Sequence, residues 1–79
     1  MLTEPEALQW IAELFEESTT RLKPETRRED VEAWDSLGVL TLMASLDSDF
    51  GVNLTDEEFQ DIDTVGDVID ILRQNGKLT

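Results

Sequence analysis

The stretch that decides the fold runs from residue 35 to residue 51 and reads DSLGVLTLMASLDSDFG. It begins with two residue types that favour helix starts, continues as an apolar run, and ends at a glycine that favours helix stops. We therefore expect a helix that begins at Ser36 or Leu37 and ends near Phe50. Because this helix is apolar nearly all round, it should be the buried, central helix of a bundle. Its outward side is predicted to be a narrow neutral stripe: Gly38, Thr41, Ser45 and Ser48.

Three further helices are indicated by capping boxes, in which a threonine is followed three residues later by an acid. The pairs are Thr3–Glu6, Thr55–Glu58 and Thr64–Asp67. The first of these helices should extend to about Glu17 or Ser18, the next is short, and the last should be capped by Gly76. The sequence predicts an all-α fold, a four-helix bundle with three main helices and one short helix. We expect a single domain spanning residues 1–79.

The connection between the first two helices, from Thr19 to Asp35, is long for a segment without secondary structure. The Lys23-Pro24 pair disfavours a helix within it, because the residue before proline avoids helical backbone angles. Three apolar residues could hold the segment against the bundle: Leu22, Val31 and Trp34.

Net charge is distributed unevenly along the 79 residues, which sum to −13. Residues 29–72 contain thirteen acids and no base, whereas the six acids and six bases elsewhere cancel. A field of one sign repels polyanions and attracts basic partners, although acidity also serves solubility alone. Nucleic acid is therefore disfavoured as a partner. No apolar stretch reaches the roughly 20 residues of a membrane span, and no signal peptide is recognisable, so we expect a cytoplasmic monomer without stable membrane insertion.

Ser36 lies where the polar segment gives way to the apolar helix, and the chain contains neither cysteine nor histidine. A hydroxyl without a neighbouring base is a poor nucleophile, so we expect no catalytic residues and no metal site. The same hydroxyl can still be modified by another enzyme, and a helix N-terminus suits a phosphate group. Taken alone, Ser36 or Asp35 is better explained as a helix cap.

Several motifs taken together resemble the acyl carrier protein family in order and spacing. They are Trp34-Asp35-Ser36-Leu37, the apolar run to Leu46, Phe50-Gly51, Asp56-Glu57-Glu58 and Asp63-Thr64-Val65-Gly66-Asp67. The resemblance implies a bundle of the acyl-carrier type with a long first loop, and a protein that is not an enzyme. It also implies a covalent 4'-phosphopantetheine, transferred from coenzyme A to Ser36 by a phosphopantetheinyl transferase. The terminal thiol of that group would hold acyl intermediates as thioesters.

The same resemblance implies partners, a docking surface and a core that could shelter an acyl chain. The partners would be acyl-loading, elongating or acyl-transferring enzymes with basic docking surfaces, in fatty-acid, lipid or specialised acyl biosynthesis. The docking residues would be Asp35, Leu37, Gly38, Thr41, Asp47, Asp49, Asp56, Glu57 and Glu58. The core residues would be Leu46, Phe59, Ile62, Val68, Ile69 and Leu72, although such a set more often forms an ordinary packed core than a ligand chamber.

Two departures from the family pattern favour a specialised, stand-alone carrier over a housekeeping one, with ordinary drift as the alternative. Gly38 and Thr41 stand where fatty-acid-type carriers usually place acids, and Trp34 precedes Asp35. A peptidyl or aminoacyl carrier is also compatible with this neutral stripe. A further alternative is an unmodified, acidic interaction protein that binds divalent cations.

A calcium-binding EF-hand is the specific form of that alternative, because acids recur at suitable intervals. Asp47, Asp49 and Glu58 occupy positions 1, 3 and 12 of such a loop. However, the loop requires a ligand at position 5 and a glycine at position 6, where this chain has Gly51 and Val52. We therefore do not expect an EF-hand.

Overall fold

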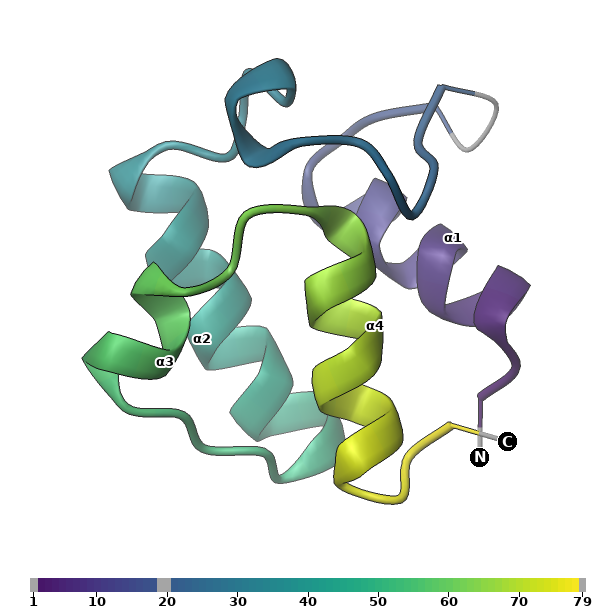
Figure 1. Ribbon diagram of the computed structural model, residues 1–79, viewed down its shortest axis with the longest axis vertical. Helices are drawn as coiled ribbons and strands as arrows, with labels where there is room; N and C mark the ends of the chain where they lie inside the picture. Colours follow the sequence, from purple (N-terminus) through teal and green to yellow (C-terminus); the bar gives the residue numbers. More distant parts are fainter. Residues whose placement is uncertain (1, 19–20, 79) are drawn as a thin grey trace.

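The computed structural model describes residues 2–18 and 21–78, and its elements are helical (Figure 1). They are α1 (Glu4–Leu14), the 3₁₀ turn η1 (Arg28–Asp30), α2 (Ser36–Phe50), α3 (Asp56–Gln60) and α4 (Val65–Gln74). Within the described ranges there is no strand, only two isolated bridges. The all-α prediction is confirmed, with three main helices and one short helix, whereas the 3₁₀ turn was not predicted.

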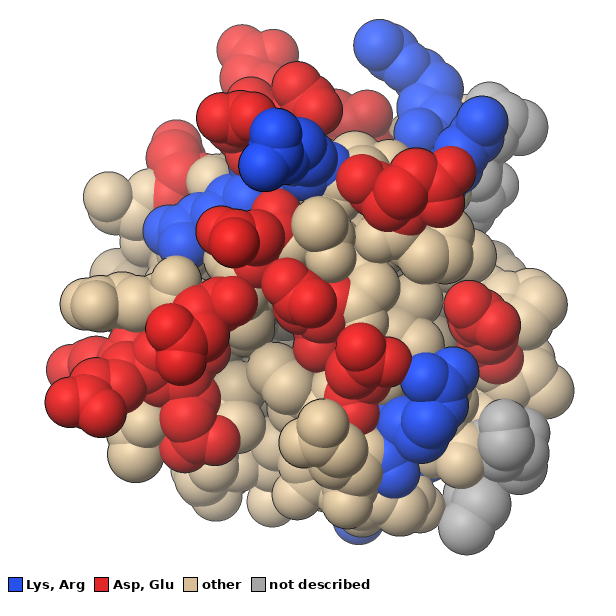
Figure 2. All heavy atoms as spheres, viewed as in Figure 1, with Lys and Arg blue, Asp and Glu red and all other residues tan. Residues whose placement is uncertain are grey.

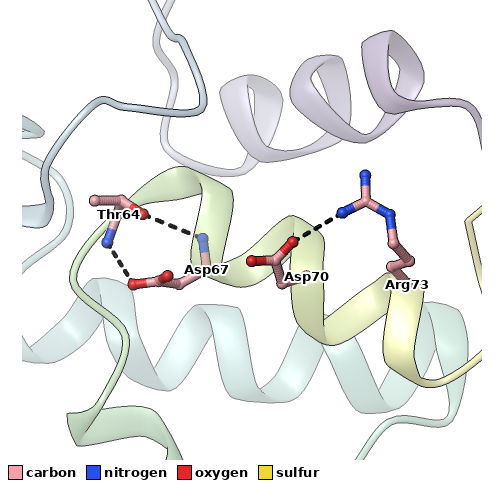
Figure 3. A network of polar contacts seen from close by, with 4 residues as sticks. All are labelled: Thr64, Asp67, Asp70 and Arg73. Carbon is pink, nitrogen blue, oxygen red and sulfur yellow. Dashed lines mark hydrogen bonds and ion pairs between the residues drawn. The ribbon is translucent and has the colours of Figure 1, made fainter.

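Local side-chain hydrogen bonds fix where the helices begin. All three predicted capping boxes form, at the starts of α1, α3 and α4. In the last of them, Thr64 Oγ1 accepts from the Asp67 N–H at 3.2 Å, and Asp67 Oδ2 accepts from the Thr64 N–H at 3.1 Å (Figure 3). Further along α4, Arg73 pairs with Asp70 at 2.8 Å. At the end of α4, Gly76 adopts a left-handed φ of 73°, which confirms it as the cap.

The end of α1 differs from the prediction. The helix stops at Leu14 rather than at Glu17 or Ser18, because Glu16 adopts a left-handed φ of 55°. The Glu17 N–H then donates to the Ala12 carbonyl at 2.8 Å and the Glu16 N–H to the Glu13 carbonyl at 3.3 Å. This is the Schellman arrangement that normally uses glycine, and a stop signal is missing from the sequence because no glycine stands there.

The core lies between α1, α2 and α4, with α3 closing one end (Figure 1). Helices α1 and α4 pack against each other. Two aromatic contacts hold α1 and α2 together: Phe15, just after α1, stacks on Trp34, just before α2, at 5.1 Å, and Trp10 of α1 meets Phe50 of α2 edge-on at 4.9 Å. The residues predicted to form the core are all buried: Leu46, Phe59, Ile62, Val68, Ile69 and Leu72.

The long connection before α2 is held in place as predicted, since Leu22, Val31 and Trp34 are buried. Residues 19 and 20 of the predicted segment lie outside the described residues. Backbone hydrogen bonds add a contact that the sequence did not predict, between this segment and the start of α4. They run from Arg28 N to Asp63 O (2.6 Å), from Val65 N to Thr26 O (2.9 Å) and from Gly66 N to Pro24 O (2.7 Å).

The prediction of which side of α2 faces outward is wrong at Gly38. Gly38 is buried, because its Cα packs against the Ala33 carbonyl: an ideal Cβ there would lie 2.0 Å from Ala33 O. Leu37 and Leu40 instead are 71% and 61% exposed. Thr41 and Ser48 are exposed as predicted, and Ser45 is half-buried. The outward side of α2 is therefore partly apolar rather than neutral.

Among the described residues, the helices are all too short or too polar to cross a lipid bilayer.

Candidate functional site

Ser36 is the first residue of α2, and its side chain is exposed. The helix is capped by Asp35, whose Oδ1 accepts a hydrogen bond from the Gly38 N–H at 2.9 Å. Because Asp35 fills the capping role, the Ser36 hydroxyl is not needed for it, and it has no hydrogen-bond partner among the described residues. The arrangement leaves a hydroxyl free at the positive end of a 15-residue helix.

An open pocket of about 290 Å³ adjoins Ser36 between α2 and α3. Its lining residues are Arg28, Ser36, Val39, Met43, Asp56, Phe59 and Gln60. Val39 and Met43 follow Ser36 at helical spacing, so the pattern along α2 could have identified them. Arg28 comes from η1, and no sequence signal placed it beside Ser36.

A second pocket, of about 360 Å³, lies where α1 meets the start of α2. It brings together four of the predicted docking residues: Asp35, Leu37, Gly38 and Thr41. Gly38 lines this pocket with backbone atoms only, so it presents no side chain to a partner. Leu40, which the sequence analysis did not include, is exposed one turn after Leu37 on the same helix.

The remaining predicted docking residues lie away from this cluster. Asp47 and Asp49 are eleven and thirteen residues after Ser36, about 16 to 20 Å along the axis of α2, and both are exposed. Asp49 also accepts a hydrogen bond from Trp10 Nε1 at 2.8 Å, which ties it to α1. Figure 2 shows carboxylates gathered over α3, whose exposed acids are Asp56, Glu57 and Glu58.

The acids that suggested an EF-hand are not arranged as a calcium loop. Asp47 and Asp49 lie inside α2, and Glu58 closes the capping box of α3 by accepting from the Thr55 N–H at 3.1 Å. Across residues 2–18 and 21–78, no cluster of three carboxylates is placed to hold a metal ion.

Known proteins that resemble this chain show which class of bundle it is and which family it belongs to. Residues 8–72 match the family described as phosphopantetheine attachment site. The chain is also 30% identical over 76 residues to an acyl carrier protein of Myxococcus xanthus, covering 91% of this chain and 96% of the relative. An acyl carrier protein of Micrococcus luteus matches equally, at 30% identity over 76 residues, with 91% and 94% coverage. The chain belongs to the acyl carrier protein family.

A shorter match supports the same assignment, since an acyl carrier protein of Porphyromonas gingivalis is 40% identical over 43 residues, 54% of this chain. Members of this family are carriers rather than catalysts, and phosphopantetheine is their prosthetic group. A carrier of this kind interacts with partner enzymes.

Proposed function

We propose that Ser36 carries 4'-phosphopantetheine as a phosphodiester, transferred from coenzyme A by a phosphopantetheinyl transferase. The observation that supports this most strongly is the exposed Ser36 hydroxyl, which has no hydrogen-bond partner in the described structure. A phosphodiester at this position fits the site, because the first turn of a helix presents unpaired N–H groups and partial positive charge.

The other two serines of α2 fit less well. Ser45 is half-buried within α2, and Ser48 lies between Asp47 and Asp49 in the C-terminal half of the helix. That end of a helix has partial negative charge and disfavours a phosphate. Ser48 is nevertheless exposed, so it is a suitable control: its hydroxyl is accessible like that of Ser36, but it lacks the partial positive charge of a helix N-terminus.

The attached group would supply the thiol that the sequence lacks, and acyl intermediates would be held on it as thioesters. The role of this chain would be to present the phosphopantetheine arm and to be recognised by the partner enzymes. The exposed Leu37, Leu40 and Thr41 beside Ser36 form a small, mostly apolar contact surface. The acids of α3 and of the last turn of α2 would attract basic groups on the partner. The absence of acid at the exposed position 41 supports a specialised clientele rather than general fatty-acid synthesis, whereas packing against Ala33 explains the glycine at position 38.

The buried core residues could shelter an acyl chain, and the open pocket beside Ser36 offers an entrance lined by Val39, Met43 and Phe59. In the structure these core residues pack against one another. An acyl chain would have to displace some of those contacts in order to enter.

The test is an intact-mass measurement after incubation with a broad-specificity phosphopantetheinyl transferase and coenzyme A. We expect wild type and Ser48→Ala to gain one phosphopantetheinyl group and Ser36→Ala to gain none. An unchanged mass for wild type, or a gain on Ser36→Ala, would refute the proposal. Loading the modified protein with acyl or aminoacyl groups then distinguishes an acyl carrier from a peptidyl or aminoacyl carrier.

A further inference from the structure

Arg28 is a cation in the pocket beside Ser36 that forms no ion pair within the described residues. It is half-buried and lines that pocket together with Ser36. The ion pairs among the described residues are Arg27 with Glu29 and Arg73 with Asp70, and neither involves Arg28. We propose that the Arg28 guanidinium binds the phosphodiester on Ser36 and so orients the base of the prosthetic arm. This inference rests on the proposed attachment at Ser36.

The charge distribution shows why such a partner is needed. A phosphodiester on Ser36 would add a negative charge beside Asp35 and next to Asp56, which lines the same pocket. Residues 29–72 contain thirteen acids and no base, so the compensating cation must come from outside that segment. Arg28 immediately precedes the segment and is the cation that lines the pocket.

Guanidinium groups suit this role because their planar donors match the oxygens of a phosphate and can form two parallel hydrogen bonds. Arg27, the neighbour of Arg28, does not line the pocket beside Ser36, is 66% exposed at its side chain, and pairs with Glu29 at 3.5 Å. Both arginines line a neighbouring pocket with Glu29 and Asp63, but of the two only Arg28 also lines the pocket beside Ser36.

The backbone of Arg28 is already fixed before any modification occurs. Its N–H donates to the Asp63 carbonyl at 2.6 Å, and its carbonyl accepts from the Val31 N–H at 3.2 Å. Arg27 pairs with Thr64 through an isolated antiparallel bridge. Binding a phosphate would thus require ordering of the Arg28 side chain alone, which limits the entropic cost.

Asp56 is the group that opposes this contact, because its carboxylate lines the pocket and competes for the same guanidinium. Removing its charge should therefore strengthen the contact between Arg28 and the phosphodiester. Asp56→Asn provides a variant whose effect is expected in the direction opposite to that of Arg28→Gln.

The experiment compares apo and modified forms of wild type, Arg28→Gln, Asp56→Asn and the matched control Arg27→Gln. Each modified sample is used only after its intact mass shows complete loading, so failure of attachment is recognised separately from failure of this inference. We expect the difference in Tm between modified and apo protein to be lower by about 4 °C in Arg28→Gln than in Arg27→Gln. In Asp56→Asn the difference should be higher than in wild type.

A second measurement requires modification of the wild-type protein only and does not depend on loading the variants. The arginine Nε–H resonances are followed by ¹⁵N NMR before and after modification, with apo Arg28→Gln and Arg27→Gln, or the corresponding lysine variants, used for assignment. We expect the Arg28 resonance to shift and the Arg27 resonance to stay in place. An unmoved Arg28 resonance, or equal Tm differences for the two arginine variants, would overturn the inference.

Discussion

At the scale of the residue, Gly38 sets how closely the loop before α2 can approach that helix. An ideal Cβ at position 38 would lie 2.0 Å from the Ala33 carbonyl oxygen and 3.4 Å from Phe15 Cε1. Since the first of these atoms belongs to the backbone, a side chain fits only if the loop moves. The absence of an acid at this position thus has a packing reason, whatever the partners require.

We predict that Gly38→Ala lowers the free energy of unfolding by about 1 to 3 kcal/mol, the range for overpacking a tight site. The loss should exceed the gain of about 1 kcal/mol in helix propensity. Urea denaturation measures it, with Ser48→Ala on the exposed side of the same helix as control. A Gly38→Ala variant as stable as wild type would show that the loop yields without cost.

Glu16 is the second residue whose backbone sets a boundary, because its left-handed φ of 55° ends α1. A non-glycine residue in the left-handed region is strained by roughly 1 to 2 kcal/mol. Glycine avoids this strain, but it offsets part of the gain because it has more conformational freedom to lose on folding. We predict that Glu16→Gly raises the free energy of unfolding by about 0.5 to 1 kcal/mol. Glu13→Gly, the same change inside α1, should lower it by about 1 kcal/mol, and thermal denaturation of both variants checks the contrast.

At the scale of the element, the capping box of α1 makes part of the stability depend on pH. Hydrogen bonds from the Thr3 backbone N–H and then from its hydroxyl, each 3.0 Å long, lower the pKa of Glu6. In the interval between the lowered and ordinary pKa, the unfolded chain binds more protons, so stability rises with pH. The contribution is complete above the ordinary glutamate pKa of about 4.3 and is lost as pH falls through the lowered value.

We therefore predict that Glu6→Gln weakens the pH dependence of unfolding below about pH 4.3. Unfolding curves recorded between pH 3 and pH 6 provide the measurement. Glu4→Gln removes one charge from the same turn without touching the Thr3 hydrogen bonds, so it serves as the charge control. Identical pH profiles for Glu6→Gln and wild type would contradict the prediction.

On the outward side of helix α2, Leu40 is 61% exposed and is not part of the buried core. Leu40→Gln should change the free energy of unfolding by no more than about 0.5 kcal/mol, as surface substitutions usually do. If this side docks on partners, the variant should lower kcat/KM of phosphopantetheinyl transfer about five-fold, which corresponds to a contact of about 1 kcal/mol. Ser48→Gln, farther along α2, should leave the transfer rate unchanged.

At the scale of the whole molecule, the net negative charge comes from residues 29–72, and the carboxylates spread over the face in view include those over α3 (Figure 2). Exposed charges act over about a Debye length, near 10 Å at 0.1 M salt. Association with a basic partner should therefore weaken as salt rises. The effect should depend on where the acids lie and not only on the total charge of −13.

We predict that removing two α3 charges, in Glu57→Gln/Glu58→Gln, lowers kcat/KM of the transfer reaction about two- to five-fold at low salt. The difference in kcat/KM between this double variant and wild type should shrink in about 0.5 M salt, because the Debye length there is shorter than the roughly 10 Å at 0.1 M. Glutamine retains the capping geometry at position 58. Glu13→Gln/Glu17→Gln carries the same charge change near the end of α1, and an equal loss there would show that only total charge matters.

Most of the candidate site could be predicted from the sequence, but its surroundings could not. Ser36 and its cap Asp35 were identifiable because a helix start is specified by adjacent residues. Arg28 was not, because its place in the pocket depends on a backbone hydrogen bond to Asp63, thirty-five residues away. The exposure of Leu40 was also missed, since a helix apolar nearly all round contains no periodicity that reveals its outward side.

The sequence by itself determined the helices and their starts, because capping boxes and apolar spacing act within three or four residues. It also determined the charge pattern and, through its motifs, the acyl carrier family. Only the tertiary structure decided which side of α2 faces outward, where α1 ends without a glycine, and which cation lies beside Ser36. Those features follow from close packing between distant segments, such as Gly38 against the loop and Arg28 against the α3–α4 connection. Such contacts have no local signature, because they depend on how the whole chain fills its core.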